Sequence, residues 1–381
     1  MPDATATAIR WVERGWLPDP LVRYGIRHLL RDRLAEMHSG DAAHAAAVTQ
    51  EFLQSMRTAP LAPLPEKANE QHYELPAEFF GHVLGPHRKY SSGYWDHGVR
   101  TLAQAEARAL ELTCEHAGIE DGQDILELGC GWGSLTLWIA ERYPRCRITA
   151  VSNSHSQRSF IEARARRRGL TNLRVVTCDF NVFDTRERFD RIVSVEMFEH
   201  LRNWPRAFAH VAGWLRPGGR FFMHVFAHRE APYPFEPRDE SDWMSRHFFS
   251  GGMMPSDDLA LHCQQDLALV KRWRWEGTHY QRTAEAWLGQ MDAEQDTLMP
   301  LFEATYGDQA AVWWERWRLF FLSVAELFGY RGGQQWWVSH YLFDKREAMP
   351  ATADATHAAA TATTTAAATT TAGTPQGAHG I

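Results

Sequence analysis

The sequence predicts an α/β fold in which a parallel sheet is covered by helices on both faces. Two observations carry this prediction. From about Pro86 onward, short apolar runs alternate with stretches of helical periodicity, which is typical of a doubly wound sheet. Within this region the buried-strand pattern of residues 125–128 leads directly into Gly129, Gly131 and Gly133, and an amphipathic helix follows. A glycine turn of this kind lets a ligand lie against the backbone at the carboxyl end of a strand.

The chain divides into three parts. In the first 85 residues apolar side chains such as Leu30 and Leu34 recur at helical spacing. Prolines at positions 60–65 end this helical pattern ahead of the α/β region. The tail consists almost entirely of Ala and Thr, with too little apolar bulk to pack. We therefore expect a helical N-terminal segment over 1–85, an α/β domain over 86–346 and a disordered tail over 347–381.

Within the α/β domain the elements follow from periodicity and turn residues. Strands are expected at 124–128, 147–152, 172–177, 191–195, 219–226 and 335–343. Helices are expected at 134–142, 156–168, 205–215, 284–295 and 308–327. The segment 231–256 is rich in Pro, acidic and aromatic residues and is too long for a plain connection, so we interpret it as a lid or substrate loop.

Composition excludes several classes of protein. The 381 residues carry a net charge of −7, which argues against a nucleic-acid partner. The five cysteines are scattered without a CxxC pair, so we expect neither disulfides nor a metal site, and a reducing, cytoplasmic location fits best. No apolar run reaches about 18 residues, and the N-terminus lacks a secretory signal. The oligomeric state stays open, with a homodimer as one alternative.

The glycine turn alone is compatible with NAD, FAD or S-adenosylmethionine. The dinucleotide pattern is GxGxxG with an acidic residue about 20 positions later, whereas this chain has GxGxG and the second strand ends at Asn153 without an acid. Glu127 suits S-adenosylmethionine, because its carboxylate can reach the amino-acid end of that ligand or brace the turn. Asp179 can accept a bond from an adenine amino group, and Phe180 could cover the ring. We therefore expect S-adenosylmethionine as the cofactor.

A second polar cluster marks the chemical site. The strand at 191–195 is followed at once by Glu196, Glu199 and His200, so two carboxylates and an imidazole gather where a reactive methyl group should lie. Methyl transfer to an amine needs a free lone pair and hence a group that takes the proton of the ammonium ion, which a Glu–His pair can do. Individually, these residues could instead cap a helix or bond backbone. His224, in the strand at 219–226, is either a satisfied core histidine or a member of the site.

These segments resemble one known group, which contains the cyclopropane-fatty-acyl-phospholipid synthases and the plant benzylisoquinoline N-methyltransferases. The resemblance covers residues 73–346. It rests on KYSSGYW at 89–95, ILELGCGWGSLT at 125–136, AVSNSHSQ at 150–157, VEMFEHL at 195–201, DWMSRHFFSGGMMPS at 242–256 and FGYRGGQQWWVSHYLF at 328–343. It implies a class I, Rossmann-like methyltransferase domain with a seven-stranded sheet and a helical cap. The cofactor residues that it and the glycine turn imply are Tyr90, Ser91, Ser92, Glu127, Gly129, Gly131, Gly133, Asn153, Gln157, Asp179, Phe180 and Val195.

The resemblance also divides the group into two branches. The synthases typically have cysteine at the position of Ser92 and glycine at the position of Glu196, and they use bicarbonate as the base, whereas the plant enzymes resemble this chain at both positions. Tyr280 matches the synthases instead. The catalytic residues implied are Glu196, Glu199, His200, His224 and Tyr280. We predict N-methylation of a hydrophobic or aromatic, isoquinoline-like amine. The alternatives are methyl transfer to an unsaturated acyl chain of a lipid and cofactor binding without catalysis.

Overall fold

The computed structural model describes residues 4–37, 42–63, 75–237 and 242–346. Residues Met1–Arg346 form one compact unit, and the tail from Glu347 onward is a second unit that lies outside the described residues, as does the prediction made for it. No helix in the described part of the chain is long and apolar enough to span a membrane.

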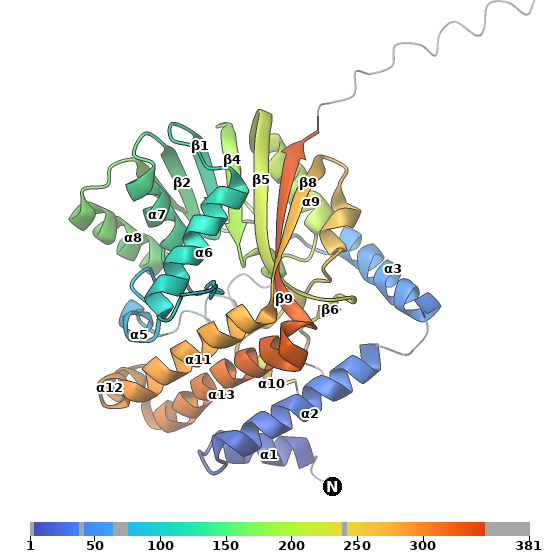
Figure 1. Ribbon diagram of the computed structural model, residues 1–381, viewed down its shortest axis with the longest axis vertical. Helices are drawn as coiled ribbons and strands as arrows, with labels where there is room; N and C mark the ends of the chain where they lie inside the picture. Colours follow the sequence, from blue (N-terminus) through green and yellow to red (C-terminus); the bar gives the residue numbers. More distant parts are fainter. Residues whose placement is uncertain (1–3, 38–41, 64–74, 238–241, 347–381) are drawn as a thin grey trace, which may run out of the picture. The chain divides into compact units, whose positions relative to one another are not determined.

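The core of the first unit is a seven-stranded sheet, which confirms the predicted α/β fold (Figure 1). Its strand order is β3-β2-β1-β4-β5-β9-β8. The five strands from β3 to β5 run parallel, while β9 runs antiparallel to both of its neighbours, β5 and β8. The prediction of an all-parallel sheet is therefore wrong at β9, which alone runs opposite to the other six strands. The strands are β1 (Asp124–Leu128), β2 (Arg147–Ser152), β3 (Leu173–Thr177), β4 (Phe189–Val195), β5 (Leu215–His228), β8 (Leu267–Trp275) and β9 (Trp336–Lys345).

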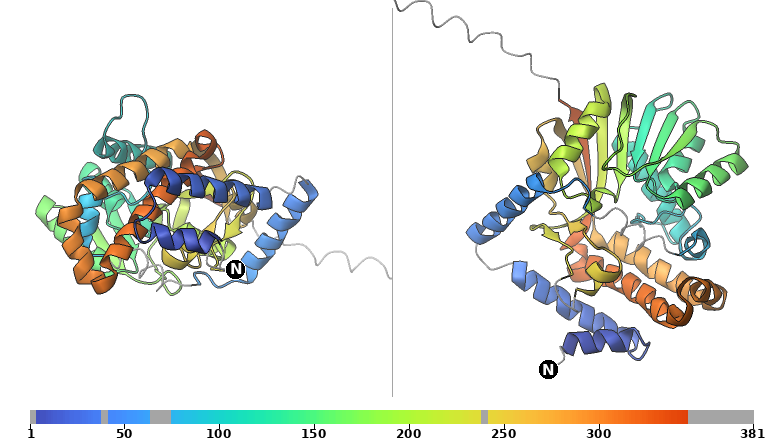
Figure 2. Two further views of the ribbon diagram at one scale, coloured as in Figure 1. Left: turned by 90° about the horizontal axis from the view of Figure 1, so that it is seen from below. Right: turned by 180° about the vertical axis from the view of Figure 1, so that it is seen from behind.

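Helices cover both faces of the sheet. α6 packs against β5 and β9 on one face, and α9 packs against β5 and β8 on the other (Figure 1, Figure 2). α6 begins at a capping box in which the side chains of Thr101 and Gln104 bond each other's backbone N–H, and α8 begins at the cap of Ser154. These helices are α6 (Leu102–Ala117), α7 (Ser134–Arg142), α8 (His155–Arg168) and α9 (Trp204–Trp214).

A layer of helices lies beyond the carboxyl ends of the parallel strands (Figure 1). Its large aromatic residues, among them Trp287, Trp317 and Phe321, are buried in one apolar cluster. Burial of side chains of this size stabilises the layer by several kcal/mol each, on the order of 1.5–3 for a Phe. The helices of the layer are α5 (Ala77–Val83), α11 (Gly277–Ala293), α12 (Gln295–Tyr306) and α13 (Ala310–Gly329), with α1 (Ala4–Val12) and α2 (Asp19–Met37) from the N-terminal segment. The third helix of that segment, α3 (Ala42–Thr58), packs against α9 instead.

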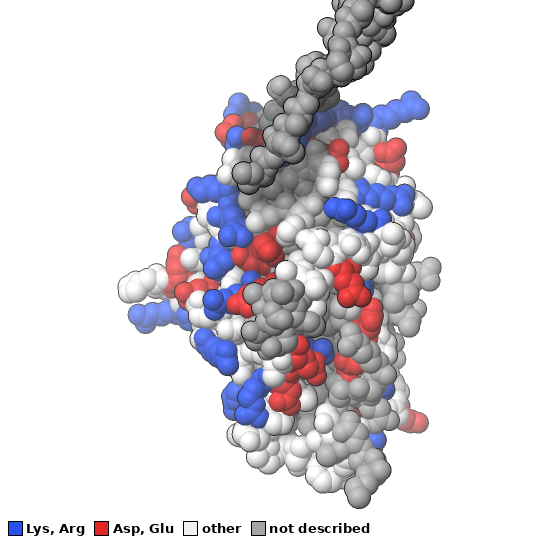
Figure 3. Space-filling model, turned by 90° about the vertical axis from the view of Figure 1, so that its right-hand side faces the viewer, with Lys and Arg blue, Asp and Glu red and all other residues white. Residues whose placement is uncertain are grey.

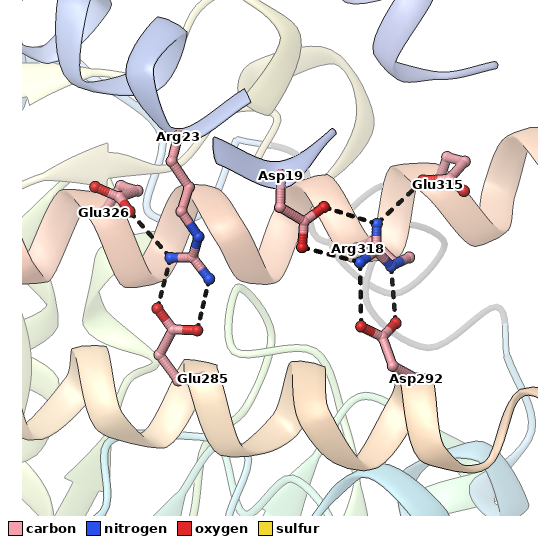
Figure 4. A network of polar contacts seen from close by, with 7 residues as sticks. All are labelled: Asp19, Arg23, Glu285, Asp292, Glu315, Arg318 and Glu326. Carbon is pink, nitrogen blue, oxygen red and sulfur yellow. Dashed lines mark hydrogen bonds and ion pairs between the residues drawn. The ribbon is translucent and has the colours of Figure 1, made fainter. Parts of the chain in front are cut away.

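Helix α2 is attached to this layer by two arginines. Arg23 on α2 bonds Glu285 of α11 and Glu326 of α13 (Figure 4). Arg318 of α13 bonds Asp19 at the start of α2 and Asp292 of α11. The predicted lid at 231–256 contains the short elements β6 (Tyr233–Pro234), α10 (Trp243–His247) and β7 (Met253–Met254). On the surface in Figure 3, acidic and basic side chains are interspersed.

Candidate active site

The glycine turn lies where the carboxyl ends of β1, β2 and β4 meet. The amides of Gly129 and Cys130 both donate to the Val151 carbonyl of β2, at 3.0 Å, which holds the turn against the neighbouring strand. Gly129 has φ +78°, and a Cβ atom there would lie 2.6 Å from Met197 Cγ, so only glycine fits. Gly131 has φ +51°, and a Cβ there would meet no atom within 4 Å. The turn is therefore closed on one side and open on the other.

The open side of the turn faces a pocket, which brings together six of the residues predicted to hold a cofactor. They come from the turn, from the end of β4 and from the segment before α6. The pocket is lined by Arg88, Lys89, Tyr90, Ser91, Leu110, Thr113, Glu127, Gly129, Cys130, Gly131, Trp132, Ser134, Leu135, Val195 and Glu196.

Glu127 braces the turn from below. Its carboxylate accepts a hydrogen bond from the Thr136 hydroxyl in the first turns of α7, and burial raises its pKa to about 7. Of the two roles that the sequence allowed for Glu127, the structure contains the bracing contact. The carboxylate links β1 to α7 and thereby sets the shape of the glycine turn between them.

The other predicted cofactor residues lie outside the lining of this pocket. Asp179 accepts a 2.8 Å bond from the Asn181 amide, and the ring of Phe180 lies 6.1 Å from that of Trp214. Gln157 is buried on α8, where its Oε1 accepts a 2.6 Å bond from Ser152. Asn153 follows β2, and Gly133 caps α7. The roles of these residues remain predictions.

The segment 89–92 is held in place by hydrogen bonds of Lys89, a residue that the sequence analysis did not single out. The buried ammonium of Lys89 donates to the Ser91 hydroxyl and, at 2.8 Å, to the Ser92 carbonyl. Burial lowers the pKa of Lys89 to about 8. Glu106 of α6 accepts from the Lys89 amide at 3.1 Å, which ties the segment to the helix. Lys89 was not among the predicted residues, although a lysine next to aromatic and glycine residues was the available signal.

Glu196 is the centre of the site. It follows β4 at φ +49°, a strained value for a residue with a side chain. Its Oε1 accepts a bond from the Ser92 amide at 3.2 Å and lies within hydrogen-bond distance of His224 Nε2, at 3.1 Å, and its Oε2 accepts from the Tyr280 hydroxyl at 2.7 Å. Burial raises the pKa of Glu196, while the nearby Lys89 and the Tyr280 bond act in the opposite direction.

Three of the five predicted catalytic residues, Glu196, His224 and Tyr280, thus meet in one hydrogen-bonded group. The other two predicted catalytic residues, Glu199 and His200, follow Glu196 closely in the sequence but make different contacts. Glu199 is fully buried and accepts a 2.8 Å bond from the Phe226 amide, and burial raises its pKa well above the usual range. The His200 ring stacks on Phe249 at 4.6 Å, and burial lowers its pKa to about 4.

Comparisons with known proteins identify the family of this chain. A family model described as mycolic acid cyclopropane synthetase matches residues 64–332. This chain belongs to that family.

Two relatives represent the N-methyltransferase branch and the synthase branch. (S)-coclaurine N-methyltransferase from Thalictrum flavum subsp. glaucum is 36% identical over 343 residues, which cover 89% of this chain and 95% of the relative. Cyclopropane-fatty-acyl-phospholipid synthase from Escherichia coli strain K12 is 29% identical over 220 residues, 57% of this chain and 54% of the relative.

Solved structures show the same pattern. The crystal structure of coclaurine N-methyltransferase bound to N-methylheliamine and SAH has a TM-score of 0.86 at 36% identity, covering 89% of this chain and 99% of that one. A cyclopropane synthase from Mycobacterium tuberculosis has a TM-score of 0.63 at 22% identity, covering 75% and 100%, and this likeness concerns the fold alone. The protein described here is thus an S-adenosylmethionine-dependent methyltransferase.

The pocket fits such a cofactor. The buried Ser134 hydroxyl lines it and has no hydrogen-bond partner among the described residues, while the space beside Gly131 is open. An unused donor and an open glycine face are suited to a polar ligand that lies directly on the backbone. When bound, S-adenosylmethionine supplies an electrophilic methyl group on a sulfonium.

Proposed function

We propose that this methyltransferase N-methylates a hydrophobic, aromatic amine and that the Glu196 carboxylate is its base. The observation that carries the proposal is the set of three contacts on the Glu196 carboxylate, which the Ser92 amide and the Tyr280 hydroxyl donate to and which His224 Nε2 approaches at 3.1 Å, so that its N–H tautomer would be the third donor. A carboxylate that accepts three hydrogen bonds is stabilised in its ionised form, against the effect of burial.

An ionised carboxylate in a buried site serves an amine acceptor in two ways. It attracts the ammonium form that a secondary amine has near neutral pH, and it can take the proton so that the nitrogen lone pair becomes free. Glu196 also lines the cofactor pocket, next to Val195 at the end of β4. The base therefore lies beside the place where the methyl group would be held, as an in-line displacement requires.

The same three donors argue against a bicarbonate-dependent reaction. In the synthases that this chain resembles, glycine stands at the position of Glu196 and bicarbonate is the base. Here the Ser92 amide, His224 and Tyr280 are already bonded to the protein's own carboxylate. A second anion would be repelled by Glu196 and would find these donors engaged. Tyr280, the residue that resembled the synthases, thus supports the amine assignment through its contact with Glu196.

Aromatic residues beside the site suit a flat, cationic acceptor. His200 stacks on Phe249, and the Phe249 ring lies 5.6 Å from that of Phe226. Aromatic faces attract ammonium ions by about 0.5–2 kcal/mol and bury aromatic rings. The N-methyltransferases among the relatives agree with this chemistry.

The acceptor can be tested with methyl-labelled S-adenosylmethionine. The purified protein is given tetrahydroisoquinoline-type cyclic amines in one series and vesicles of unsaturated phospholipid, with and without bicarbonate, in another. We expect label in the amine nitrogen and none in the lipid. Label that appears only in acyl chains, and only with bicarbonate, would overturn the proposal in favour of lipid modification. Binding of cofactor without label in any acceptor would instead support a non-catalytic role.

A further inference from the structure

Behind Glu196 a second buried histidine lies against His224. β5 and β9 are antiparallel, and His224 and His340 stand directly opposite each other in the register of this pair. His340 Nε2 lies 2.9 Å from His224 Nδ1, and both side chains are completely buried. A hydrogen bond between two buried imidazoles requires one of them to donate and the other to accept.

A third histidine extends the contact to the edge of the core. His116, in the last turn of α6, places its Nδ1 2.8 Å from His340 Nδ1. Its ring stacks on Trp273 of β8 at 4.1 Å, and the residue is only half-buried. We call Glu196, His224, His340 and His116 the imidazole chain. It connects the buried carboxylate of the site with the side of α6.

The hydrogen-bond roles along this chain are coupled. A neutral imidazole has one N–H donor and one acceptor nitrogen. If Glu196 is ionised, His224 must donate from Nε2 and accept at Nδ1. His340 must then donate from Nε2 and accept at Nδ1, and His116 must donate from Nδ1. The state of the carboxylate therefore specifies all three tautomers, and the donor at the far end is the Nδ1–H of His116.

We propose that His340 and His116 are positioning residues, which hold His224 in the tautomer that donates to Glu196. This inference rests on the proposed role of Glu196 as the base. Without the His116 donor, His340 can carry its proton on Nδ1 and turn a lone pair toward His224. His224 can then carry its own proton on Nδ1, which leaves a lone pair of Nε2 facing the carboxylate. That arrangement disfavours the ionised form of Glu196.

Burial favours the neutral form of the three imidazoles, and positive charges nearby act in the same direction. Burial is the main cause that lowers the pKa of His224 and His340, and the positive charge of Lys89 acts in the same direction. The pKa of His116 is lowered to about 4 by burial and by Lys271 and Arg108.

Other charges act on Glu196 itself. Lys89 favours its ionised form, and Glu196 in turn raises the pKa of its neighbour Glu199. None of these groups is altered by a substitution at His116, so its effect on Glu196 can be read separately.

The test uses two substitutions at His116. His116→Leu removes the donor, whereas His116→Asn keeps an N–H at the position of Nδ1. The matched control is His28→Leu, at an exposed histidine of α2. Long-range ¹⁵N–¹H spectra of histidine-labelled, S-adenosylhomocysteine-bound protein report the tautomer of His224, whatever the methyl acceptor is. The pH profile of kcat/KM, with the acceptor found in the labelling assay, reports the ionisation of Glu196.

We expect His224 to be the Nε2–H tautomer in the wild-type, His116→Asn and His28→Leu proteins. In His116→Leu we expect a population of Nδ1–H tautomer and an acid limb of kcat/KM that moves up by about one pH unit, a tenfold loss below it. The inference is overturned if wild-type His224 is already the Nδ1–H form or an imidazolium. It is also overturned if His116→Leu leaves the tautomer or the pH profile unchanged. A lipid acceptor would refute the proposed function while leaving the tautomer measurement valid.

Discussion

The phenol of Tyr280 donates a 2.7 Å hydrogen bond to Oε2 of Glu196, while the other oxygen of that carboxylate lies 3.1 Å from His224 Nε2. Tyr280 lies in α11 of the helical layer, and Glu196 follows a central strand of the sheet. The Glu196 carboxylate is thus held between the sheet and the helical layer. Contacts at this junction should control both the ionisation of Glu196 and the rate of methyl transfer.

Removing the Tyr280 hydroxyl should make the Glu196 carboxylate harder to ionise. The phenol lowers the pKa of Glu196, so Tyr280→Phe should raise that pKa and move the acid limb of kcat/KM to higher pH. A hydrogen bond to a charged group contributes about 1.5–3 kcal/mol, which corresponds to a loss of roughly tenfold or more near pH 6. The measurement is a pH–rate profile. Tyr24→Phe, at an exposed tyrosine, is the control, and identical profiles for both variants would refute the role of Tyr280.

Glu199 should affect stability in a pH-dependent way. Its pKa is raised in the folded protein, so its contribution is fully present below the unfolded value near 4.5 and is lost as pH rises toward the folded value. Glu199→Gln keeps an acceptor for the Phe226 amide but cannot ionise. Its free energy of unfolding relative to wild type should rise by about 1.4 kcal/mol for each pH unit between the two pKa values. Urea denaturation at pH 5, 6.5 and 8 checks this, and a pH-independent difference would contradict it.

Gly131 of the glycine turn and Gly169, the C-cap of α8, offer a matched pair of substitutions. Gly131 and Gly169 have φ of +51° and +68°, and a Cβ atom at either would meet nothing within 4 Å. Both alanine variants should therefore lose a similar stability, about 1 kcal/mol. Only Gly131 lines the pocket, so Gly131→Ala should weaken S-adenosylhomocysteine binding tenfold or more in calorimetry. Equal affinities in the two variants would place the cofactor elsewhere.

The arginine anchors of α2 should control its local stability. Arg318 is mostly buried and bonds Asp19 of α2 and Asp292 of α11 (Figure 4). Arg318→Ala leaves both carboxylates without this partner, so α2 should exchange its amide hydrogens at least tenfold faster. Arg31→Ala serves as the control, because the Arg31 side chain is 61% exposed and its ion pair with Asp32 is long, at 4.0 Å. Unchanged exchange in α2 would show that Arg318 does not contribute to holding the helix.

Local patterns predicted the five parallel strands, the edge strand β3 included, but missed β8 at the other edge. The bounds of β1 and α7 match the prediction, because an apolar run, a glycine turn and an amphipathic helix each leave a clear signal. β8 was missed, since it lies at the sheet edge and its exposed part carries Lys271, Arg272 and Arg274. The antiparallel direction of β9 leaves no trace in periodicity, because an alternating or apolar strand pattern is the same in either direction.

The sequence predicted which residues belong to the site, but not which of them bond one another. Glu196 and His224 were recognised at strand ends, yet only the fold shows that Tyr280, 84 positions from Glu196, bonds the same carboxylate. His340 and His116 were not predicted at all. The available signal was a histidine within the apolar strand 335–343, since a buried imidazole needs a hydrogen-bond partner and β9 could supply one to its neighbour.

The role of Glu196 as a built-in base is tested most directly by Glu196→Gly with added carboxylates. The variant frees the Ser92 amide, His224 and Tyr280 and leaves space for a small anion, while Glu196→Gln keeps that space filled. Methyl transfer to the cyclic amine should fall at least 100-fold in both variants, with S-adenosylhomocysteine affinity retained. Acetate or bicarbonate should restore part of the activity in Glu196→Gly and none in Glu196→Gln. Activity of Glu196→Gly close to the wild-type level without any added anion would contradict the assignment of Glu196 as the base.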